Sequence, residues 1–436
     1  MHADVLPSIA RPFVPPPPPI VPPLHNFGVR SEFVGESRDF RRLAIQGGLL
    51  EFVTFGFYRF WLATNVRRHL WSSTLIEGEP FEYTGTAKEL FIGFLFALAI
   101  LVPIYFAYFL LGVEAERKNA FASTPLVLFL YAFGQFAIYR ARRYRLTRTI
   151  WRGVRFWMDG SGLGYAWRAC LWGFLVFLTM GLALPWREAA LERYKMRHTY
   201  YGDLQGDFAG TGWQLFKRGW WLWLLAWLPF VLLIGVGIAA GIVLSTVSHG
   251  GKLTQEQIGV VVLVYMLVVL LMAPLLPFLY AAFKATEWRW WASGLRFGKL
   301  SVTSNLSRDA LFGNYWATIG WSVLIFMIFF GGIVTVLVGL GLPLEDKKHS
   351  ADAMRAIAQG SPLGIALLSG YFAGYFATIL AIGAAVRVFL MRGIWVKVTA
   401  SLSITGLATA HAVTARGEAA NALGEGFADS LDIMGF

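Results

Sequence analysis

Two polar side chains interrupt apolar stretches of this sequence at places where chemistry inside a membrane could occur. Glu51 is flanked by two leucines on one side and by phenylalanine and valine on the other, and Gln135 stands within another apolar stretch. A carboxylate in hydrocarbon is costly unless it reaches water or a cation, so an ionisable group there indicates a pathway or a partner. Glu51 and Gln135 are therefore candidate sites for a substrate or a proton. The alternative interpretation makes Glu51 an interfacial residue that reaches water.

Arginines near the ends of the apolar stretches form a second candidate set. Such clusters bind anionic lipid headgroups more often than a specific ligand, and long basic side chains can reach the headgroups from within a span. The candidate contacts with anionic lipids are Arg68, Arg143, Arg148, Arg168, Arg193 and Arg387. We expect membrane lipids as partners. No nucleic-acid partner is expected, because the net charge of +12 lies beside the apolar stretches.

Sequence patterns that mark enzymes are missing. There is no H-E-x-x-H, G-x-S-x-G or P-loop pattern, as found in metalloproteases, α/β-hydrolases and nucleotide-binding proteins. The single cysteine, Cys170, excludes a disulfide framework and a site built from several thiolates. The sequence thus predicts no catalytic residue, no metal and no cofactor, and favours a protein that is not an enzyme.

The elements that must position these side chains are membrane helices. With 56% apolar residues, 15% charged residues and a mean hydropathy of +0.55, the composition lies outside the range of soluble domains. A helix needs ~20 residues to cross the hydrocarbon core. Eight apolar segments approach this length, at 41–62, 88–113, 121–139, 166–186, 219–247, 258–283, 312–342 and 362–390.

Basic residues indicate which connections face the cytoplasm. Eight strict crossings would place the strongly basic loops on either side of the fourth segment on opposite sides of the membrane. The simplest solution has about six transmembrane helices plus two re-entrant or interfacial helical elements, formed by the first and fourth segments. Both termini are then cytoplasmic. The alternative is eight spans with a local violation of the charge rule.

The first and fourth apolar segments resemble each other in sequence. A shift of 125 residues aligns 49–91 with 174–216, with identical residues at 11 of 43 positions. Each copy has a Thr-x-Gly step, which predicts a bend because glycine weakens a helix and the threonine hydroxyl can bond a freed carbonyl. The sequence therefore predicts an internal repeat. Its bend and interface residues are Thr54, Gly56, Trp61, Thr179, Gly181 and Trp186.

The predicted fold class is an all-α polytopic membrane protein with small cytoplasmic β elements. The β elements are expected where residues 81–84 alternate in polarity between two glycines. The expected parts are a disordered proline-rich tail (1–26), two membrane repeat units (27–164 and 165–311), a C-terminal transmembrane hairpin (312–390) and a cytoplasmic tail (391–436).

Several motifs together resemble the YjgN-like family of bacterial inner-membrane proteins, a domain of unknown function. They are Thr54–Trp61, Phe81–Leu90, Arg143–Gly153 and Gly424–Asp429. The resemblance implies a multi-pass protein of the bacterial inner (cytoplasmic) membrane. It implies no established activity and no site residues.

Two classes of function remain open. A permease or transporter-like protein for a small solute is favoured by repeated segments interrupted by glycine. The alternative is a non-catalytic lipid-binding or envelope scaffold module, favoured by the many arginines and aromatic residues at the membrane surface. A permease should bring Glu51 close to a cation or a cavity, whereas a lipid module should leave the interior of the bundle filled.

Overall fold

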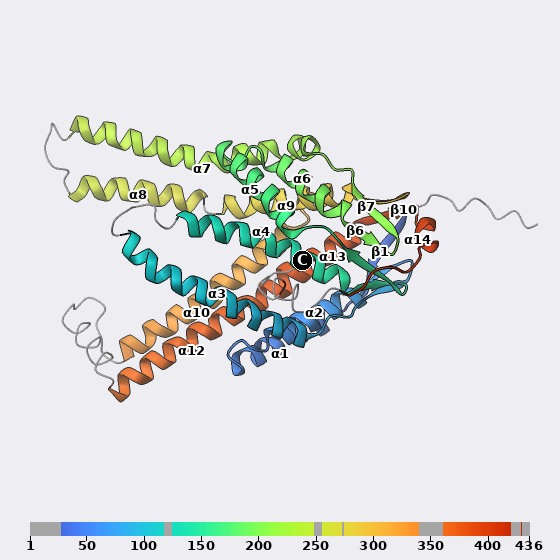
Figure 1. Cartoon of the computed structure of the whole chain (residues 1–436). Helices are drawn as coiled ribbons and strands as arrows, with labels where there is room; N and C mark the ends of the chain where they lie inside the picture. Colours follow the sequence, from blue (N-terminus) through green and yellow to red (C-terminus); the bar gives the residue numbers. More distant parts are fainter. Residues whose placement is uncertain are drawn as a thin grey trace, which may run out of the picture.

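The protein has a helical part and a strand-rich part at opposite ends (Figure 1). The structure is a computed structural model that describes residues 28–116, 124–247, 255–272, 274–339, 361–419 and 429. The expected tail 1–26 lies outside the described residues. So do most of the sequence beyond 419 and large parts of the connections 114–119, 248–257 and 343–361, which are polar without a strong excess of one charge and are therefore expected outside the cell.

Three groups of helices extend away from the strands (Figure 1). They are α3 (Ala87–Glu116) with α4 (Thr124–Thr147), α7 (Gly212–Val247) with α8 (Gln255–Met272) and α9 (Leu275–Gly294), and α10 (Phe312–Gly339) with α12 (Pro362–Ala385). The described residues include five stretches that are long and apolar enough to cross a membrane: Ala87–Leu110, Gly212–Ile242, Ile258–Gly294, Phe312–Val336 and Gly364–Ala400. Within any of them at most 17% of the most apolar window is buried, so their surfaces are available to lipid.

The first and fourth apolar segments do not form long helices. α1 (Ser37–Val53) and α5 (Gly162–Leu178) have 17 residues each, and each is followed by a separate helix, α2 (Arg59–Ser72) or α6 (Leu184–Arg197). The third segment lies in α4, which has 24 residues but becomes basic in its C-terminal half and is not among the five apolar stretches. The number of membrane crossings stays a prediction.

Both helix breaks have the same backbone geometry. In the first, Phe55 and Gly56 have φ values of 50° and 89°; in the second, Met180 and Gly181 have φ values of 50° and 90°. The Thr54 hydroxyl donates to the carbonyl of Leu50 (2.7 Å), and the Thr179 hydroxyl donates to that of Leu175 (2.8 Å). Each hydroxyl oxygen also accepts the backbone N–H of the residue four positions on, from Tyr58 at 3.0 Å and from Ala183 at 3.1 Å, and so replaces the carbonyl that these N–H groups lose where the glycine turns the chain.

The expected fold class is correct only in part: the described residues are mostly helical and include long apolar helices, but the strands expected as small β elements form one closed antiparallel barrel of ten, so the protein is not purely all-α. The order around the barrel is β1-β10-β9-β8-β7-β6-β5-β4-β3-β2. The strands are β1 (Val29–Phe33), β2 (Thr74–Ile76), β3 (Glu79–Tyr83), β4 (Thr149–Trp151), β5 (Val154–Met158), β6 (Thr199–Tyr201), β7 (Leu204–Phe208), β8 (Leu295–Phe297), β9 (Leu300–Ser304) and β10 (Leu402–Thr405).

Four of the strand pairs are hairpins with short turns. Glu77-Gly78 and Arg152-Gly153 have positive φ at both residues, as a type I′ turn requires. These hairpins are local, but the barrel closes only where β1 pairs with β10, which lies more than 350 residues away in the sequence. Hairpin signals in the sequence therefore do not reveal the barrel.

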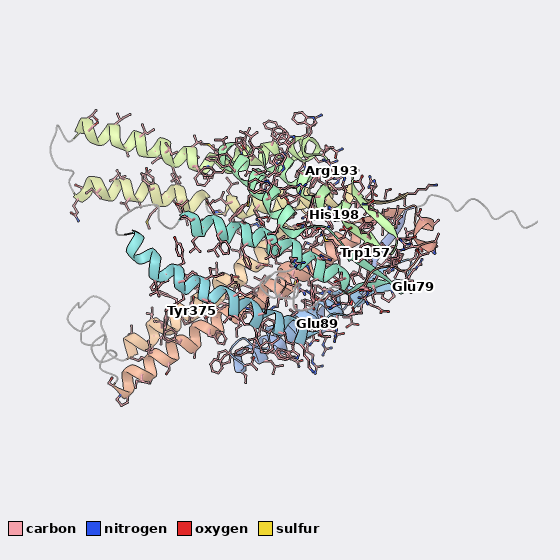
Figure 2. The ribbon with its side chains drawn as sticks, viewed as in Figure 1. Glu79, Glu89, Trp157, Arg193, His198 and Tyr375 are labelled. Carbon is pink, nitrogen blue, oxygen red and sulfur yellow. The ribbon has the colours of Figure 1, made fainter. Side chains whose placement is uncertain are left out.

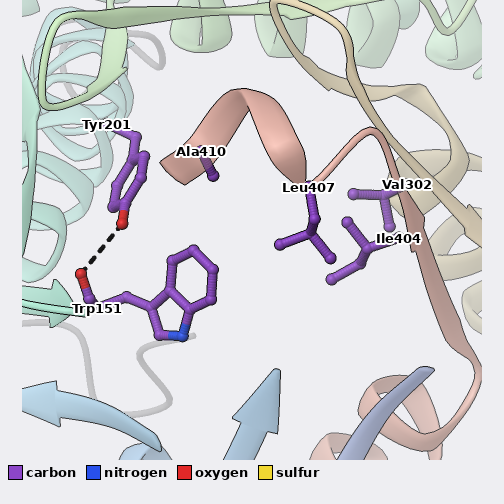
Figure 3. Close-up of a cluster of buried hydrophobic side chains, with 6 residues drawn as sticks. All are labelled: Trp151, Tyr201, Val302, Ile404, Leu407 and Ala410. Atoms are coloured by element: carbon purple, nitrogen blue, oxygen red, sulfur yellow. Dashed lines mark hydrogen bonds between the residues drawn. The ribbon is translucent and has the colours of Figure 1, made fainter. Parts of the chain in front are cut away.

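Apolar side chains fill the end of the barrel that is farthest from the long helices (Figures 1 and 3). Trp151, Tyr201, Val302 and Ile404 point inward from the strands, and Leu407 and Ala410 cover them from around the short helix α14 (Ala408–His411). At its other end the barrel meets the inner ends of the helices. The last of these, α13 (Arg392–Ala400), continues α12 through the π-helical segment η1 (Val386–Met391).

Candidate functional site

A cavity of about 540 Å³, called here the central chamber, lies where the barrel meets the helices. Strand residues such as Ile76, Phe81 and Phe156 form one part of its wall. Helices α2, α4, α6, α9 and α13 form the rest. The wall contains five tryptophans: Trp71, Trp288, Trp290, Trp291 and Trp395.

Hydrogen bonds and stacking hold these tryptophans in place. The indole nitrogen of Trp71 donates to the Thr149 hydroxyl, and that of Trp395 donates to the Thr74 hydroxyl, both at 2.9 Å. The Trp71 and Trp395 rings stack with centroids 4.7 Å apart. Because their polar atoms are satisfied and their rotamers are fixed by contacts, these rings form a preformed wall.

Charged side chains enter the chamber from three helices. Arg142 of α4 donates to Glu192 of α6 at 3.1 Å, and Lys195 pairs with the same carboxylate. On α9, Lys284 donates to Glu287 at 2.6 Å. Lys195 and Lys284 are each three residues from their partner on the same helix, which puts both members of a pair on one helix face, and here that face points inward. The sequence analysis did not identify these residues as a site. They lie beyond the apolar segments 166–186 and 258–283, in stretches that were expected to be cytoplasmic connections.

The two chamber glutamates of α6 differ in their proton affinity. Burial would raise the pKa of Glu192, but the charges of Lys195 and Arg142 outweigh it and lower the pKa to about 2. Burial raises the pKa of Glu188 above its ordinary value, and Arg187 offsets only part of this rise. Glu192 is therefore an anion at neutral pH. Glu188 is the more easily protonated of the two carboxylates.

A buried anion site adjoins the chamber. Arg67 of α2 donates to the carboxylate of Asp429 with two nitrogens, one of them at 3.1 Å, and Arg145 of α4 donates to it at 3.0 Å. Arg67 also donates to the Tyr83 hydroxyl at 3.2 Å. Arg145 lines the chamber as well, so the two sites share a wall.

An open basic groove of about 500 Å³ lies between α5 and α6 on the outside of the protein. It brings together two predicted lipid contacts, Arg168 and Arg193, and adds Arg197 and His198, which sequence reasoning did not single out. Arg193 and His198 are labelled in Figure 2. Arg168 lies over the Tyr194 ring at 4.6 Å.

The other predicted lipid contacts are not in this groove. Arg68 donates to the carbonyl of Gly85 at 3.0 Å, as Arg193 does to that of Gly210 at 3.1 Å. Arg148 makes a two-pronged contact with Glu89 at 3.1 Å, and Arg143 lies on α4. Arg387 binds the predicted substrate or proton residue Glu51.

The remaining predicted residues do not line the chamber. Glu51 is 3% exposed and Gln135 on α4 is 9% exposed. Trp61 stacks on Tyr58, and Trp186 packs against Trp213 and Phe216. In the part of the chain that the structure describes, no group of three or more histidine, cysteine, aspartate or glutamate side chains could hold a metal.

Comparison with known proteins places the chain among bacterial proteins of unknown function. The family model of DUF898, described as a bacterial protein of unknown function, matches residues 29–430. The inner membrane protein YjgN of Escherichia coli K12 is 24% identical over 159 residues, which cover 36% of this chain and 37% of the relative. YjgN of Escherichia coli O157:H7 is 27% identical with the same coverage. The matched region thus spans just over a third of these curated relatives, and no solved structure matches. The resemblance drawn from the sequence motifs is confirmed.

Proposed function

We propose that this chain, which belongs to the DUF898 family of bacterial proteins of unknown function, binds an amphiphilic molecule in its central chamber. The proposal rests on the size of the chamber and on the composition of its wall. A space of about 540 Å³ with mostly apolar and aromatic walls and a few fixed polar groups has the size and composition of a ligand site. The proposal modifies the lipid-binding alternative, which expects a filled interior, because the ligand lies inside the protein as well as around it.

The chamber is placed to receive molecules from the bilayer. Trp288 lies in the apolar stretch Ile258–Gly294 and Trp395 in the stretch Gly364–Ala400. Both therefore belong to the chamber-side ends of apolar stretches that are long enough to cross a membrane. A molecule dissolved in the membrane could reach the chamber along these helices without crossing bulk water.

Charge pairing within the wall favours binding over catalysis. Glu192 is held by Arg142 and Lys195, and Glu287 is held by Lys284. Groups locked in such pairs orient a polar headgroup by hydrogen bonds, whereas a catalytic acid or base needs to exchange its proton easily.

The basic groove between α5 and α6 supports a contact with anionic lipids at the membrane surface. Arg168, Arg193 and Arg197 gather there with His198, and the carboxylate of Asp159 lies 2.8 Å from His198. Basic pockets of this kind attract phosphate headgroups. Arg148 and Arg387 bind carboxylates, so for them we favour a structural role.

A second candidate function is a permease. It is favoured by Glu51, which lies beside the cation Arg387 as a coupled carboxylate would. Arg387 belongs to the π-helical segment η1, and such segments occur often at functional sites. Glu51 does not line the chamber, so the amphiphile-binding function remains the better supported one.

We also propose that the two bent elements are copies of one repeat and that the barrel lies in the cytoplasm with both termini. The repeat is supported by the matching φ values at the two bends and by the matching bonds of Arg68 and Arg193. The orientation is supported by the gathering of the basic connections at the barrel end of the protein (Figure 1).

The function can be tested with a phospholipid that carries a photoactivatable group on its acyl chain. Protein in vesicles is irradiated, and crosslinked peptides are mapped by mass spectrometry. The variant Leu146→Trp fills the chamber from α4, and Leu128→Trp, on the exposed face of the same helix, is its control. We expect crosslinks at chamber residues in the parent and in Leu128→Trp and their loss in Leu146→Trp. Crosslinks confined to the outer helix faces in all three proteins would overturn the proposal.

A further inference from the structure

Five helices run into the barrel, and each is followed directly by a pair of its strands. α2 leads into β2 and β3, α4 into β4 and β5, α6 into β6 and β7, and α9 into β8 and β9. α13 leads into β10, which pairs with β1. The strand order therefore also gives the order of the helix ends around the central chamber, which is α2, α4, α6, α9, α13 and again α2. In this ring α13 lies opposite the neighbouring helices α4 and α6.

The two opposite sides of the chamber differ in polarity. The residues of α13 that line it are uncharged: Ile394, Trp395, Val398 and Thr399. The residues of α4 and α6 that line it are mostly charged: Arg142, Arg145, Leu146, Glu188, Glu192 and Lys195. An amphiphile in the chamber therefore finds a polar side and an apolar side that face each other.

The polar side has a cation that its glutamates do not neutralise. Arg142 and Lys195 share one carboxylate, that of Glu192. The other two glutamates of the wall each have a cation of their own, in the pairs Arg187 with Glu188 and Lys284 with Glu287. In the part of the chain that the structure describes, these seven side chains thus carry one more positive charge than negative charges.

Both cations that share Glu192 have donors left for a ligand. The Nη2 atom of Arg142 lies 3.4 Å from the sulfur of Met196, which is a weak acceptor. The Lys195 ammonium has three donors, and its contacts among the described residues are with Glu192 and with the face of the Tyr165 ring, 5.9 Å away. Because Lys195 is only 9% exposed, water can hydrate it little. A single negative charge brought into the chamber would both balance the excess and use these donors.

We propose that the chamber selects an anionic lipid, whose acid group accepts hydrogen bonds from Arg142 and Lys195 and whose acyl chain lies against α13. The inference rests on the proposed function, since it names the chemical class of the bound amphiphile. A carboxylate and a phosphate ester both suit the site, because guanidinium and ammonium groups form short, charge-assisted hydrogen bonds with either. A neutral lipid would leave the positive charge unbalanced where it is poorly hydrated.

The test uses two pairs of lipids that have the same acyl chains within each pair. One pair is a fatty acid and its fatty alcohol, and the other is a phosphatidylglycerol and its diacylglycerol; all carry a photoactivatable group in the acyl chain. The full-length protein in phosphatidylcholine nanodiscs is irradiated, and crosslinks to the α13 peptide that contains Trp395 are quantified by mass spectrometry. We expect an acid to label this peptide about tenfold more than its neutral partner, since a hydrogen bond to a charged group can supply this factor. A preference in the first pair identifies a fatty acid as the ligand, and a preference in the second pair identifies a phospholipid.

Two variants remove the excess charge without leaving a carboxylate unpaired. In Arg142→Gln and in Lys195→Met, Glu192 keeps one cation. Each variant should lower labelling by the acid about tenfold, to the level of the neutral partner, and should leave labelling by the neutral lipid unchanged. Arg289→Gln is the matched control, because Arg289 is an exposed residue of α9 that does not line the chamber, and it should match the parent.

Equal labelling by acids and neutral lipids in the parent would overturn the inference and leave the chamber as a site for uncharged amphiphiles. An acid preference that both variants keep would overturn it as well. If neither variant folds, the cluster around Glu192 is a structural ion-pair network, and the inference falls. A lack of crosslinks anywhere in the chamber wall with all four lipids would also contradict the proposed function itself.

Discussion

Arg387 binds Glu51 with both of its terminal nitrogens, at 2.9 and 3.0 Å from the two carboxylate oxygens. The pair joins the end of the last hairpin to the first bent element, 336 residues away in sequence. It supplies the cation that a carboxylate among apolar residues needs.

Glu51→Gln should destabilise the protein by about 2 kcal/mol, because it leaves Arg387 without its counter-charge. This is less than the ~3–5 kcal/mol of a fully buried pair, since the Arg387 side chain is 23% exposed. Glu51→Val combined with Arg387→Met should recover most of the loss, as Val176 occupies the corresponding position of the second bent element. Thermal unfolding in detergent measures this. Unchanged stability of Glu51→Gln would argue against a structural pair.

The chamber glutamates should give opposite effects of pH. Glu192 has a folded-state pKa of about 2, below its ordinary 4.5, so its stabilisation is complete above pH 4.5 and is lost as the pH falls towards 2. This contribution is of the order of 3 kcal/mol and should be absent in Glu192→Gln. Unfolding by denaturant between pH 3 and 7 measures it.

Glu188 is the control for that experiment. Its pKa is raised in the folded state, so ionisation at neutral pH opposes folding and protonation relieves the cost. Glu188→Gln should therefore be as stable as the parent or more stable at pH 7. A similar loss in both variants would show that the carboxylates matter through their contacts and not through their charge.

Closure of the barrel can be tested with a disulfide across β1 and β10. Arg30 lies opposite Ser403, so cysteines at these positions, with Cys170→Ala, should crosslink on oxidation of the purified protein. Glu32→Cys with Ser403→Cys is offset by two residues and should react poorly. Linked peptides are detected by mass spectrometry. Equal yields from both pairs would contradict the register.

Orientation can be tested by labelling single cysteines in whole cells. Glu79→Cys and Asp207→Cys lie in exposed positions of β3 and β7, and we expect both to resist an impermeant thiol reagent applied outside. Asn119→Cys, in a connection expected outside, should react. Labelling of both barrel positions would place the barrel outside the cell, and labelling of only one would contradict the closed barrel that contains β3 and β7.

The basic groove predicts a selective loss of anionic lipid. Arg168→Gln and Arg197→Gln should each weaken phosphatidylglycerol binding about fivefold, since a basic residue at the surface contributes about 1 kcal/mol. Arg68→Gln is the control, because Arg68 makes the same type of carbonyl contact as Arg193 outside this groove. Lipid retained after gel filtration is quantified by native mass spectrometry. An equal loss in Arg68→Gln would indicate a general effect of charge.

The amino-acid sequence by itself determined the features that depend on neighbouring residues. Runs of apolar residues predict membrane helices because hydrocarbon excludes polar groups, and the residues that the structure describes include five helices long and apolar enough to cross a membrane. The Thr-x-Gly steps predicted bends, and the chain turns at Gly56 and Gly181 because glycine accepts a positive φ there. Family membership also followed from local motifs.

Only the tertiary structure decided the features that join distant residues. Short strands give weak signals, and the barrel exists because β1 meets β10 from the other end of the chain. The chamber, the Glu51 and Arg387 pair and the contact of Asp429 with Arg67 have the same origin. Each depends on how the helices pack around the barrel. A periodic pattern in the sequence predicts which face of a helix is apolar, but it does not predict which side chains of distant helices will contact one another.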